Sequence, residues 1–444
     1  MKSLLTFPKG GVHPPECKSQ SQGLAIEVMP VPDELELILG QHIGAPCAPT
    51  VAKRAEVGEG GMIGEVTKGL GVPLHAPVAG KIKDIGMSVH PIRVSAPSIT
   101  ITVDREAAPV HYEKQAWQQL DSARLLTKVH AAGIIGIGGA GFPTHVKLKP
   151  PANSPVDTLI LNGAECEPYI TADHRVMLES AAAVVEGAKI ILKILGIKQC
   201  HIGIENNKPD AIREMTKAAE QGSGSASGPD CTIKVDALQV KYPQGSEKQL
   251  IQAITGRKVP AMALPSAVGV VVQNVSTAKA ICDAVVYGKP LYEKVITVAG
   301  KGIGRPANLQ VKIGTKLKDI VEYLGGLKPG LTKIILGGPM MGFAVSSLDV
   351  PVTKTTSAIL FLTDDEIDTR PHSQCIRCGW CLEACPMGLE PKEIAIYVEA
   401  NRAQDTAQFG VFDCFECGSC AYVCPAKRPI VQFVRLAKMK AKRP

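Results

Sequence analysis

Aromatic residues and long apolar runs are both scarce in this chain of 444 residues. Phe, Tyr and Trp together make up only 4% of the sequence, and no run of 18 or more consecutive apolar residues occurs. We therefore expect no transmembrane helix, and the apolar stretch at 4–7 is too short for a secretory signal. Without secretion a disulfide framework is not expected, so the eight of the 14 cysteines that cluster between 375 and 424 point to metal chemistry.

Acidic residues are absent after residue 426. The net charge of +7 equals the number of basic residues in that tail, so residues 1–426 are close to neutral. A nucleic-acid-binding protein usually interleaves basic with aromatic residues over a folded face, so we expect no nucleic-acid partner. One side of the tail is apolar, which fits docking to a membrane complex or anionic lipid, with a solvated tail as the alternative. The apolar residues are Ile430, Val431, Phe433, Val434 and Leu436.

Hydrophobic residues make up 45% of the chain, which provides a sizeable core and excludes general disorder. The length suggests roughly two to four domains. Local patterns predict a multidomain α/β protein. Its expected divisions are a domain of short β-strands over 1–115, an α/β domain over 116–290, a small β-grasp-like unit over 291–345, a linker over 346–370, a cysteine-rich domain over 371–426 and the basic tail over 427–444.

The α/β domain is predicted from apolar strand segments that alternate with segments of helical periodicity. Strands are expected at 156–161, 201–205 and 268–272, helices at 176–195 and 277–286, and a flexible connection (GSGSASGP) at 222–229. The β-grasp-like unit is expected to contain strands at 295–298 and 333–336 and a helix at 317–324. Glycine loops between strands and helices in such a domain indicate a nucleotide site.

Eight of the cysteines form two identically spaced runs. Each run has the spacing Cys-x2-Cys-x2-Cys-x3-Cys-Pro, which is the pattern of bacterial ferredoxins. Three closely spaced thiolates bind one cluster, and the fourth is carried by the following helix to the other cluster. We therefore predict two [4Fe–4S] clusters, one bound by Cys375, Cys378, Cys381 and Cys424 and the other by Cys385, Cys414, Cys417 and Cys420. Structural zinc, the alternative, needs two separated cysteine pairs rather than two complete runs.

The densest glycine loop lies at 136–147 and reads GIGGAGFPTHVK. Small residues let backbone N–H groups approach a phosphate or a flat ring, and Lys147 adds a positive charge. The segment LNGAECEP at 161–168 then places Asn162, Glu165 and Glu167 where an apolar strand ends, the edge at which open α/β sheets bind ligands. Taken alone, the two carboxylates also fit solvated residues at a strand end. Cys166 between them is expected to be a packed thiol rather than a nucleophile.

Together these motifs resemble one known family. GIGGAGFPTHVK, LNGAECEP, the tandem ferredoxin runs and the opening FPKGGVHPP at 7–15 are similar to the family of RnfC proteins from Rnf electron-transport complexes, over essentially the whole chain. The central part also resembles the NADH-binding, FMN-bearing subunit of respiratory complex I. Residues 1–115 resemble the barrel-sandwich hybrid domain of lipoyl and biotinyl carriers, read here as a structural β domain. Residues 291–345 resemble the soluble-ligand-binding β-grasp module.

The resemblance implies FMN and NAD(H) as cofactors and assigns residues to them. The flavin loop would consist of Gly138, Gly139, Ala140, Gly141 and Phe142, with Lys147 on the phosphate side. Asn162 and Glu165 match residues near the isoalloxazine and ribityl groups, and Asn274 and Thr277 match the segment that holds the FMN phosphate. Glu167 and Glu247 match carboxylates on the NADH side. The departures from the complex I pattern are Ala164, Ser246, Gln273 and Ser276.

The function that the resemblance implies is hydride exchange between NAD(H) and FMN, with single electrons passing through the two clusters. The Rnf family couples reduced ferredoxin and NAD to Na⁺ or H⁺ movement. The expected partners are therefore NAD(H), the other subunits of a membrane complex and, indirectly, ferredoxin, and the expected location is the cytoplasmic face of the membrane. Two alternatives stay open: a cobalamin reductase-like flavin and iron–sulfur protein of a propanediol microcompartment, and a non-catalytic docking subunit.

Overall fold

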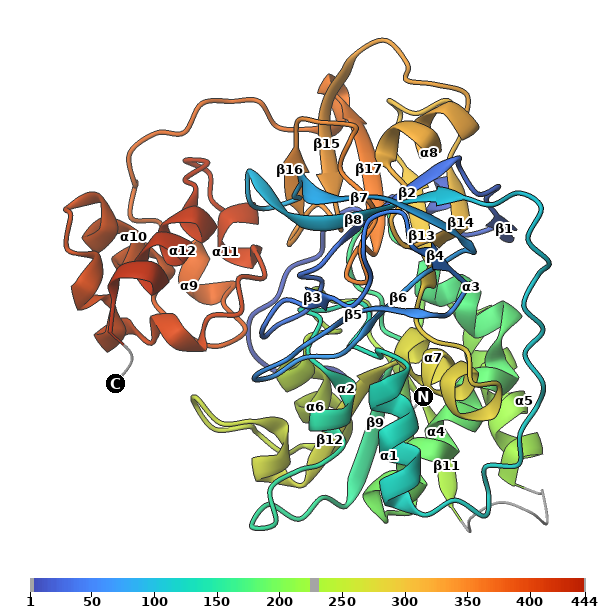
Figure 1. The fold of residues 1–444 in the computed structure, drawn as a ribbon. Coiled ribbons are helices and arrows are strands. Elements are labelled where there is room, and N and C mark those ends of the chain that lie inside the picture. The colour runs from blue at the N-terminus through green and yellow to red at the C-terminus, as the bar shows by residue number, and fades with distance from the viewer. Residues whose placement is uncertain (1–3, 224–230, 443–444) are drawn as a thin grey trace.

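The chain folds into a large body and a smaller helical lobe beside it (Figure 1). The computed structural model describes residues 4–223 and 231–442. Three units make up the body, namely an N-terminal β domain, an α/β domain and a β-grasp unit, and the lobe carries helices α9 to α12. Within the described ranges, no helix combines the length and the apolar character that crossing a membrane requires.

The N-terminal β domain consists of two small sheets that share one core. Their strand orders are β2-β8-β7-β4 and β3-β5-β6. The strands are β2 (Glu34–Ile38), β3 (Ala48–Pro49), β4 (Glu56–Val57), β5 (Met62–Glu65), β6 (Leu74–His75), β7 (Gly80–Val89) and β8 (Ser95–Val103). Because alternate side chains of a strand point to one face, Leu35, Leu37 and Ile99 are fully buried against Ile63 of the second sheet.

The α/β domain is built on a parallel sheet with the order β11-β10-β9-β12. Its strands are β9 (Thr158–Asn162), β10 (Gln199–Glu205), β11 (Thr232–Leu238) and β12 (Val270–Asn274). Its helices are α1 (Ser122–Ala131), α2 (Thr144–Lys147), α3 (Ala172–Glu179), α4 (Ala181–Leu195), α5 (Pro209–Ser223), α6 (Glu247–Thr255) and α7 (Val275–Val286). Since all four strands run in one direction, Asn162 and Asn274 end paired strands at the same edge of the sheet.

The predicted elements of this domain are present, with one difference. The helix expected at 176–195 is two helices, because Ser180 leaves the helical conformation and lies between α3 and α4. Serine is a residue type favoured at the start of a helix, which suits the beginning of α4 there. The connection expected at 222–229 begins inside α5 and otherwise lies outside the described residues.

The β-grasp unit is a six-stranded sheet with the order β1-β14-β13-β17-β15-β16 and the helix α8 (Leu317–Tyr323). Its strands are β1 (Ile26–Val28), β13 (Glu293–Ala299), β14 (Ala307–Lys312), β15 (Leu331–Leu336), β16 (Phe343–Val345) and β17 (Ala358–Thr363). Two of these strands lie outside the range 291–345. The stretch predicted as a linker contains β17, which is buried at every residue between β13 and β15. Its continuous apolar run is typical of a strand covered on both faces.

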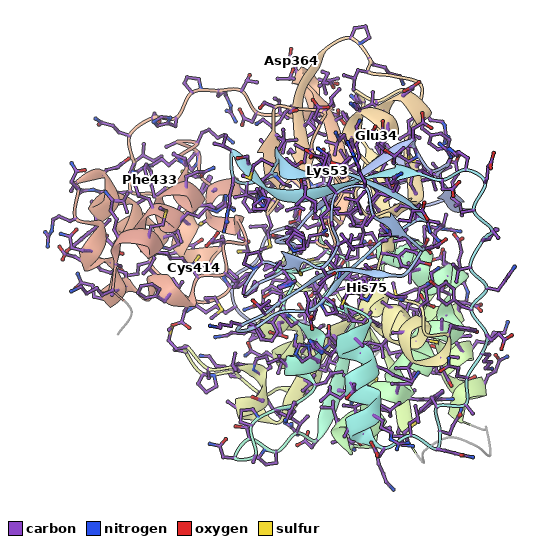
Figure 2. All side chains as sticks on the ribbon, viewed as in Figure 1. Glu34, Lys53, His75, Asp364, Cys414 and Phe433 are labelled. Atoms are coloured by element: carbon purple, nitrogen blue, oxygen red, sulfur yellow. The ribbon has the colours of Figure 1, made fainter. Side chains whose placement is uncertain are left out.

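The lobe contains short helices around the two cysteine runs. These are α9 (Trp380–Glu383), α10 (Pro391–Glu399), α11 (Ser419–Tyr422) and α12 (Ile430–Lys440). Short 3-10 helices complete the chain: η1 (Lys18–Gln20), η2 (Pro265–Val268), η3 (Asp364–Glu366), η4 (Ala403–Phe409) and η5 (Val411–Asp413). Figure 2 places Cys414 and Phe433 in this lobe, apart from His75 in the body.

The segment predicted as a separate basic tail is an integral part of the lobe. Ile430, Val434 and Ala437 recur at helical spacing on α12 and are buried. Val434 and Ala437 share a core with residues of α10. Two of the basic residues are also engaged, because Arg435 and Lys438 both form ion pairs with Glu416. The apolar side that suggested a docking surface therefore packs mainly against its own domain.

Helices α4 and α7 approach each other closely enough that one position admits only glycine. A Cβ atom added at Gly187 would lie 1.9 Å from the carbonyl oxygen of Ala278. This contact joins two of the helices that cover the parallel sheet, and the pair is part of the largest buried core.

We expect Gly187→Ala to lower the midpoint of thermal unfolding. Overpacking of this kind costs about 1–3 kcal/mol, more than the helix propensity that alanine gains over glycine, about 1 kcal/mol. Gly58→Ala is the matched control, since a Cβ there meets no atom within 4 Å. Equal midpoints for the two variants, measured by circular dichroism, would contradict the contact.

Candidate functional site

The eight cysteines of the two ferredoxin runs line two pockets in the lobe. We call them the inner cysteine pocket and the outer cysteine pocket. The inner pocket is lined by Cys385, Cys414, Cys417 and Cys420. The outer pocket is lined by Cys375, Cys378, Cys381 and Cys424. The fourth cysteine of each run thus lies with the first three of the other run, which is the grouping expected from the ferredoxin pattern.

Burial and backbone hydrogen bonds act on the thiols of the inner cysteine pocket. Among the described residues, no three His, Cys, Asp or Glu side chains are arranged to hold one metal ion. Backbone N–H groups of Leu389 and Glu416 donate to the sulfurs of Cys385 and Cys414, both at 3.4 Å. Burial raises the pKa of Cys414 to about 11, and cluster binding would displace that proton.

The inner cysteine pocket faces the body. The hydroxyl of Tyr242 donates to the carbonyl oxygen of Cys417 at 2.6 Å. A Cβ at Gly418 would lie 2.7 Å from the carbonyl oxygen of Met340, so the lobe and the β-grasp unit touch there. The amide of Gln249 on α6 donates to the carbonyl oxygen of Pro386 at 3.2 Å. These contacts place one pocket against the α/β domain and the β-grasp unit.

The outer cysteine pocket faces solvent instead. Cys378 is exposed, and the neighbouring Ile376 and Trp380 are 65% and 53% exposed. The residues that line either pocket all belong to the lobe, so the difference lies in what surrounds each pocket. The two pockets therefore differ in surroundings although their cysteine runs are identical in spacing.

The glycine loop lies beside the start of α7. Gly138 and Gly141 both have positive φ values, 78° and 70°, which glycine adopts without strain. The N–H of Ile137 donates to Thr277 at 2.9 Å, and a Cβ on Gly138 would lie 3.0 Å from the amide nitrogen of Asn274. The structure thus brings together the glycine loop, Asn274 and Thr277, which the sequence placed far apart.

Asp173 belongs to this group, although no sequence motif indicated it. Its carboxylate accepts hydrogen bonds from Asn274 at 2.6 Å and from Ser276 at 2.5 Å. Asn274 in turn caps α7 by accepting from the N–H of Ser276. Burial raises the pKa of Asp173. The only local signal was that Asp173 is an acidic residue in the first turn of α3, the helix that follows LNGAECEP.

Two of the predicted ligands bind each other in the structure. Lys147 on α2 and Glu247 at the start of α6 form an ion pair at 2.5 Å, and both are partly exposed. A phosphate that entered this region would compete with Glu247 for the ammonium group. At Gly139 of the glycine loop, an added Cβ would meet no atom within 4 Å, so the backbone there is accessible to a ligand.

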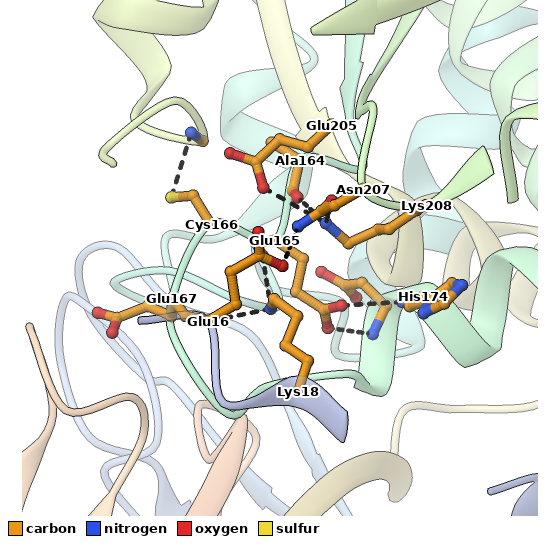
Figure 3. A network of polar contacts seen from close by, with 12 residues as sticks. Glu16, Lys18, Ala164, Glu165, Cys166, Glu167, His174, Glu205, Asn207 and Lys208 are labelled. Carbon is orange, nitrogen blue, oxygen red and sulfur yellow. Dashed lines mark hydrogen bonds and ion pairs between the residues drawn. The ribbon is translucent and has the colours of Figure 1, made fainter. Parts of the chain in front are cut away.

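Residues 162–170, which we call the ligand loop, begin at the last residue of β9. Asn162 donates to the carbonyl oxygen of Gly245 at 2.7 Å and accepts from the N–H of Ala164 at 3.1 Å. Glu165 accepts from the N–H groups of Asp173 and His174 at 2.6 and 3.2 Å, which places its carboxylate at the start of α3 (Figure 3).

Glu167 points to the β-grasp unit. Its carboxylate accepts from the N–H groups of Met340 and Met341 at 3.1 and 3.0 Å, in the glycine-rich turn after β15. A Cβ on Gly338 in that turn would lie 2.2 Å from this carboxylate, so only glycine fits. The carboxylate predicted to contact NADH thus lies between the α/β domain and the turn that touches the inner cysteine pocket.

Burial dominates the ionisation of the ligand loop. It raises the pKa of Glu165 to about 7 and that of Glu167 to about 7. The thiol of Cys166 accepts from the N–H of Gly245 at 3.3 Å, and burial raises its pKa far above the ordinary range. This environment fits the packed thiol that was expected, because a nucleophile needs a lowered pKa.

A parallel α/β sheet with a ligand loop at its strand ends, joined to a lobe with two four-cysteine pockets, defines an iron–sulfur oxidoreductase component. Models of four domain families match the chain, in the predicted order. They are the RnfC barrel sandwich hybrid domain at 5–106, the Nuo51 FMN-binding domain at 129–283, the SLBB domain at 295–344 and a 4Fe-4S dicluster domain at 371–428. The predicted fold class is confirmed.

The chain is also similar over nearly its whole length to RnfC proteins, of which we describe two. One comes from the proton-translocating ferredoxin:NAD(+) oxidoreductase complex of Clostridium ljungdahlii and is 45% identical, over 98% of this chain and 94% of that protein. The other comes from the Na(+)-translocating ferredoxin:NAD(+) oxidoreductase complex of Acetobacterium woodii and is 41% identical, over 97% of this chain and 96% of that protein. The chain belongs to the RnfC family of ion-translocating ferredoxin:NAD oxidoreductase complexes, as predicted.

A solved structure shares the fold. The NAD+-reducing [NiFe]-hydrogenase in its H2-reduced state matches with a TM-score of 0.53 and 18% identity, over 74% of this chain and 64% of that chain. At this identity the likeness shows a common fold alone.

The two carboxyls of the ligand loop predict a pH effect on stability. Their pKa rises from 4.5 to about 7 on folding, so the folded state binds more protons than the unfolded state between these values. Stability from these groups is therefore lost as pH rises through that window and is constant above it.

We expect Glu167→Gln to remove the part of this pH-dependent loss of stability that Glu167 causes. The thermal midpoint of the variant, relative to the unchanged protein, should rise as pH increases from about 4.5 to about 7. Glu106→Gln is the control, since Glu106 is exposed, and it should show a constant difference. A pH-independent difference for Glu167→Gln would contradict the raised pKa.

Proposed function

We propose that this chain is the peripheral, NAD(H)-reactive subunit of an Rnf-type complex at the cytoplasmic face of a membrane. The proposal rests on membership of the RnfC family together with one geometric observation. The ligand loop and the inner cysteine pocket meet within the protein, because Glu167 binds the turn of Met340 and that turn touches Gly418. A nucleotide site and an iron–sulfur site in contact are what transfer between NAD(H) and one-electron carriers needs.

FMN, when bound, exchanges a hydride with NAD(H) and single electrons with iron–sulfur clusters. The chain would hold it through its own groups: backbone N–H groups of the loop Gly138–Phe142 and the ammonium of Lys147 suit a phosphate, as does the start of α7 near Thr277. Asn162 and Glu165 at the sheet edge would orient the ring and the ribityl chain. Asp173 supports this surface by fixing Asn274.

Glu167 and Glu247 would position the nicotinamide nucleotide. Neither is needed as an acid or a base, since the hydride passes between cofactors. Glu167 is held by two backbone N–H groups of the β-grasp unit, so its carboxylate has a fixed direction. Glu247 forms an ion pair with Lys147, the proposed phosphate-side lysine.

The two cysteine pockets would each hold one [4Fe–4S] cluster. The inner cysteine pocket lies next to the nucleotide site and the outer one at the solvent-facing side of the lobe. The order of the two pockets, inner then outer, supports a route for single electrons from the α/β domain to other subunits of the complex. Those subunits would move Na⁺ or H⁺, and the complex would connect this chain indirectly to ferredoxin. The relatives favour this activity over that of a cobalamin reductase or a docking subunit.

Anaerobic titration of the purified protein with NADH tests the central claim. We expect flavin absorbance to bleach and the cluster absorbance to fall with it, because electrons would pass from FMN to the pockets. Iron and acid-labile sulfide should each approach about eight per chain, as two cubanes require. A flavin spectrum that NADH leaves unchanged would refute NAD(H) reactivity.

Serine substitutions test the assignment of ligands. Cys385→Ser and Cys414→Ser should abolish the same signal in electron paramagnetic resonance of the reduced protein, and Cys424→Ser and Cys375→Ser should abolish the other. Each should lower the iron content by about half. Cys47→Ala in the β domain is the control and should keep both signals. If Cys385→Ser and Cys375→Ser remove the same signal, each run holds its own cluster.

A further inference from the structure

Lys18 is a buried lysine that binds the backbone of the ligand loop. It lies at the start of η1 and is only 5% exposed. Its ammonium donates to the backbone carbonyl oxygens of Glu165 and Glu167 at 2.9 Å each (Figure 3). It also donates to the carbonyl oxygen of Ile170 at 2.5 Å. All three protons of the ammonium are used, and all three acceptors lie within six residues.

This convergence accounts for the unusual shape of the ligand loop. Glu165 and Tyr169 have positive φ values, 47° and 66°, which are unfavourable for residues other than glycine. Three carbonyl dipoles directed at one buried point would repel each other and lack partners without a cation there. The ammonium of Lys18 supplies that cation and so compensates for the strained backbone.

A second lysine holds the beginning of the same loop. Lys208 is 1% exposed, and its ammonium donates to the carbonyl oxygen of Ala164 at 2.7 Å and to Asn207 at 2.9 Å. It also pairs with Glu205 at 3.4 Å. Burial and the charge of Lys208 lower the pKa of Lys18, against the opposing effect of Glu165 and Glu205.

The segment that carries Lys18 is itself fixed to the loop. The N–H of Tyr169 donates to the carbonyl oxygen of Glu16 at 2.9 Å, and the hydroxyls of Ser21 and Thr171 are 2.8 Å apart. Upstream, the N–H of Gly11 donates to the carbonyl oxygen of Ala384 at 3.0 Å, beside the inner cysteine pocket. The N-terminal segment thus contacts both the ligand loop and the lobe.

We propose that Lys18 is a positioning residue, which holds the ligand loop in the conformation that presents Asn162, Glu165 and Glu167 to the flavin and the nicotinamide nucleotide. The inference rests on the proposed function, since it concerns the same site. It differs from a purely structural role because two of the three carbonyls that Lys18 binds belong to Glu165 and Glu167, whose side chains are proposed ligands. Loss of the ammonium should therefore weaken ligand binding in addition to any loss of stability.

The test compares full-length variants. Lys18→Met removes the charge and the three donors at similar volume, and Lys18→Arg keeps both. Lys189→Met is the matched control, since Lys189 is also buried but lies on α4 and pairs with Glu186. The FMN dissociation constant of flavin-depleted protein is measured by quenching of flavin fluorescence. The NADH concentration that half-reduces the flavin is measured anaerobically on reloaded protein.

We expect Lys18→Met to weaken FMN binding about tenfold or more and to raise the half-reducing NADH concentration. Lys18→Arg should restore most of both, and Lys189→Met should change neither. If Lys18→Met does not fold, Lys18→Gln is measured in its place. Equal ligand binding in folded Lys18→Met and Lys189→Met would overturn the inference. Failure of the unchanged protein to bind FMN or respond to NADH would instead refute the proposed function.

Discussion

Buried ammonium groups that donate to backbone carbonyls hold the units of this protein together. Lys354 donates to the carbonyl oxygen of Pro73 in the β domain and to that of Gly133 in the α/β domain, while Lys294 donates to the carbonyl oxygen of Lys354 itself. Burial lowers the pKa of Lys354 to about 8 and that of Lys294 to about 7. Removing a donor from such a junction leaves buried carbonyls without partners, which is costly. The relative placement of the domains therefore depends on these lysines.

The candidate site exists because that placement is fixed. Its glycine loop and ligand loop come from the α/β domain, the turn that binds Glu167 comes from the β-grasp unit, and the thiols come from the lobe. Tyr242 contributes to both sides, since it follows β11 and donates to Cys417. A shift of the lobe would break the contacts of Tyr242 and Gln249 with it and so separate the ligand loop from the inner cysteine pocket.

Much of this organisation could be predicted where the signal is local. The strands around Asn162 and Asn274, the order of the units and the grouping of Cys385 with the second run follow from periodicity and from spacings of a few residues. The prediction placed β17 in a linker and α12 in a separate tail. An apolar run in a sequence does not indicate which sheet or helix it will pack against. Asp173 and Lys18 gave almost no signal, because a single charged residue in a sequence is usually solvated.

By itself, then, the sequence determined the chemistry that the chain can carry: two ferredoxin runs, a glycine loop and a strand that ends in Asn and Glu. Each of these is a short-range pattern that needs no knowledge of the rest of the fold. Only the tertiary structure decided which cysteine pocket faces the body, that Lys147 meets Glu247, and that Lys18 lies under Glu165. These contacts join residues about a hundred or more positions apart, and close packing of separate units, not local propensity, brings them together.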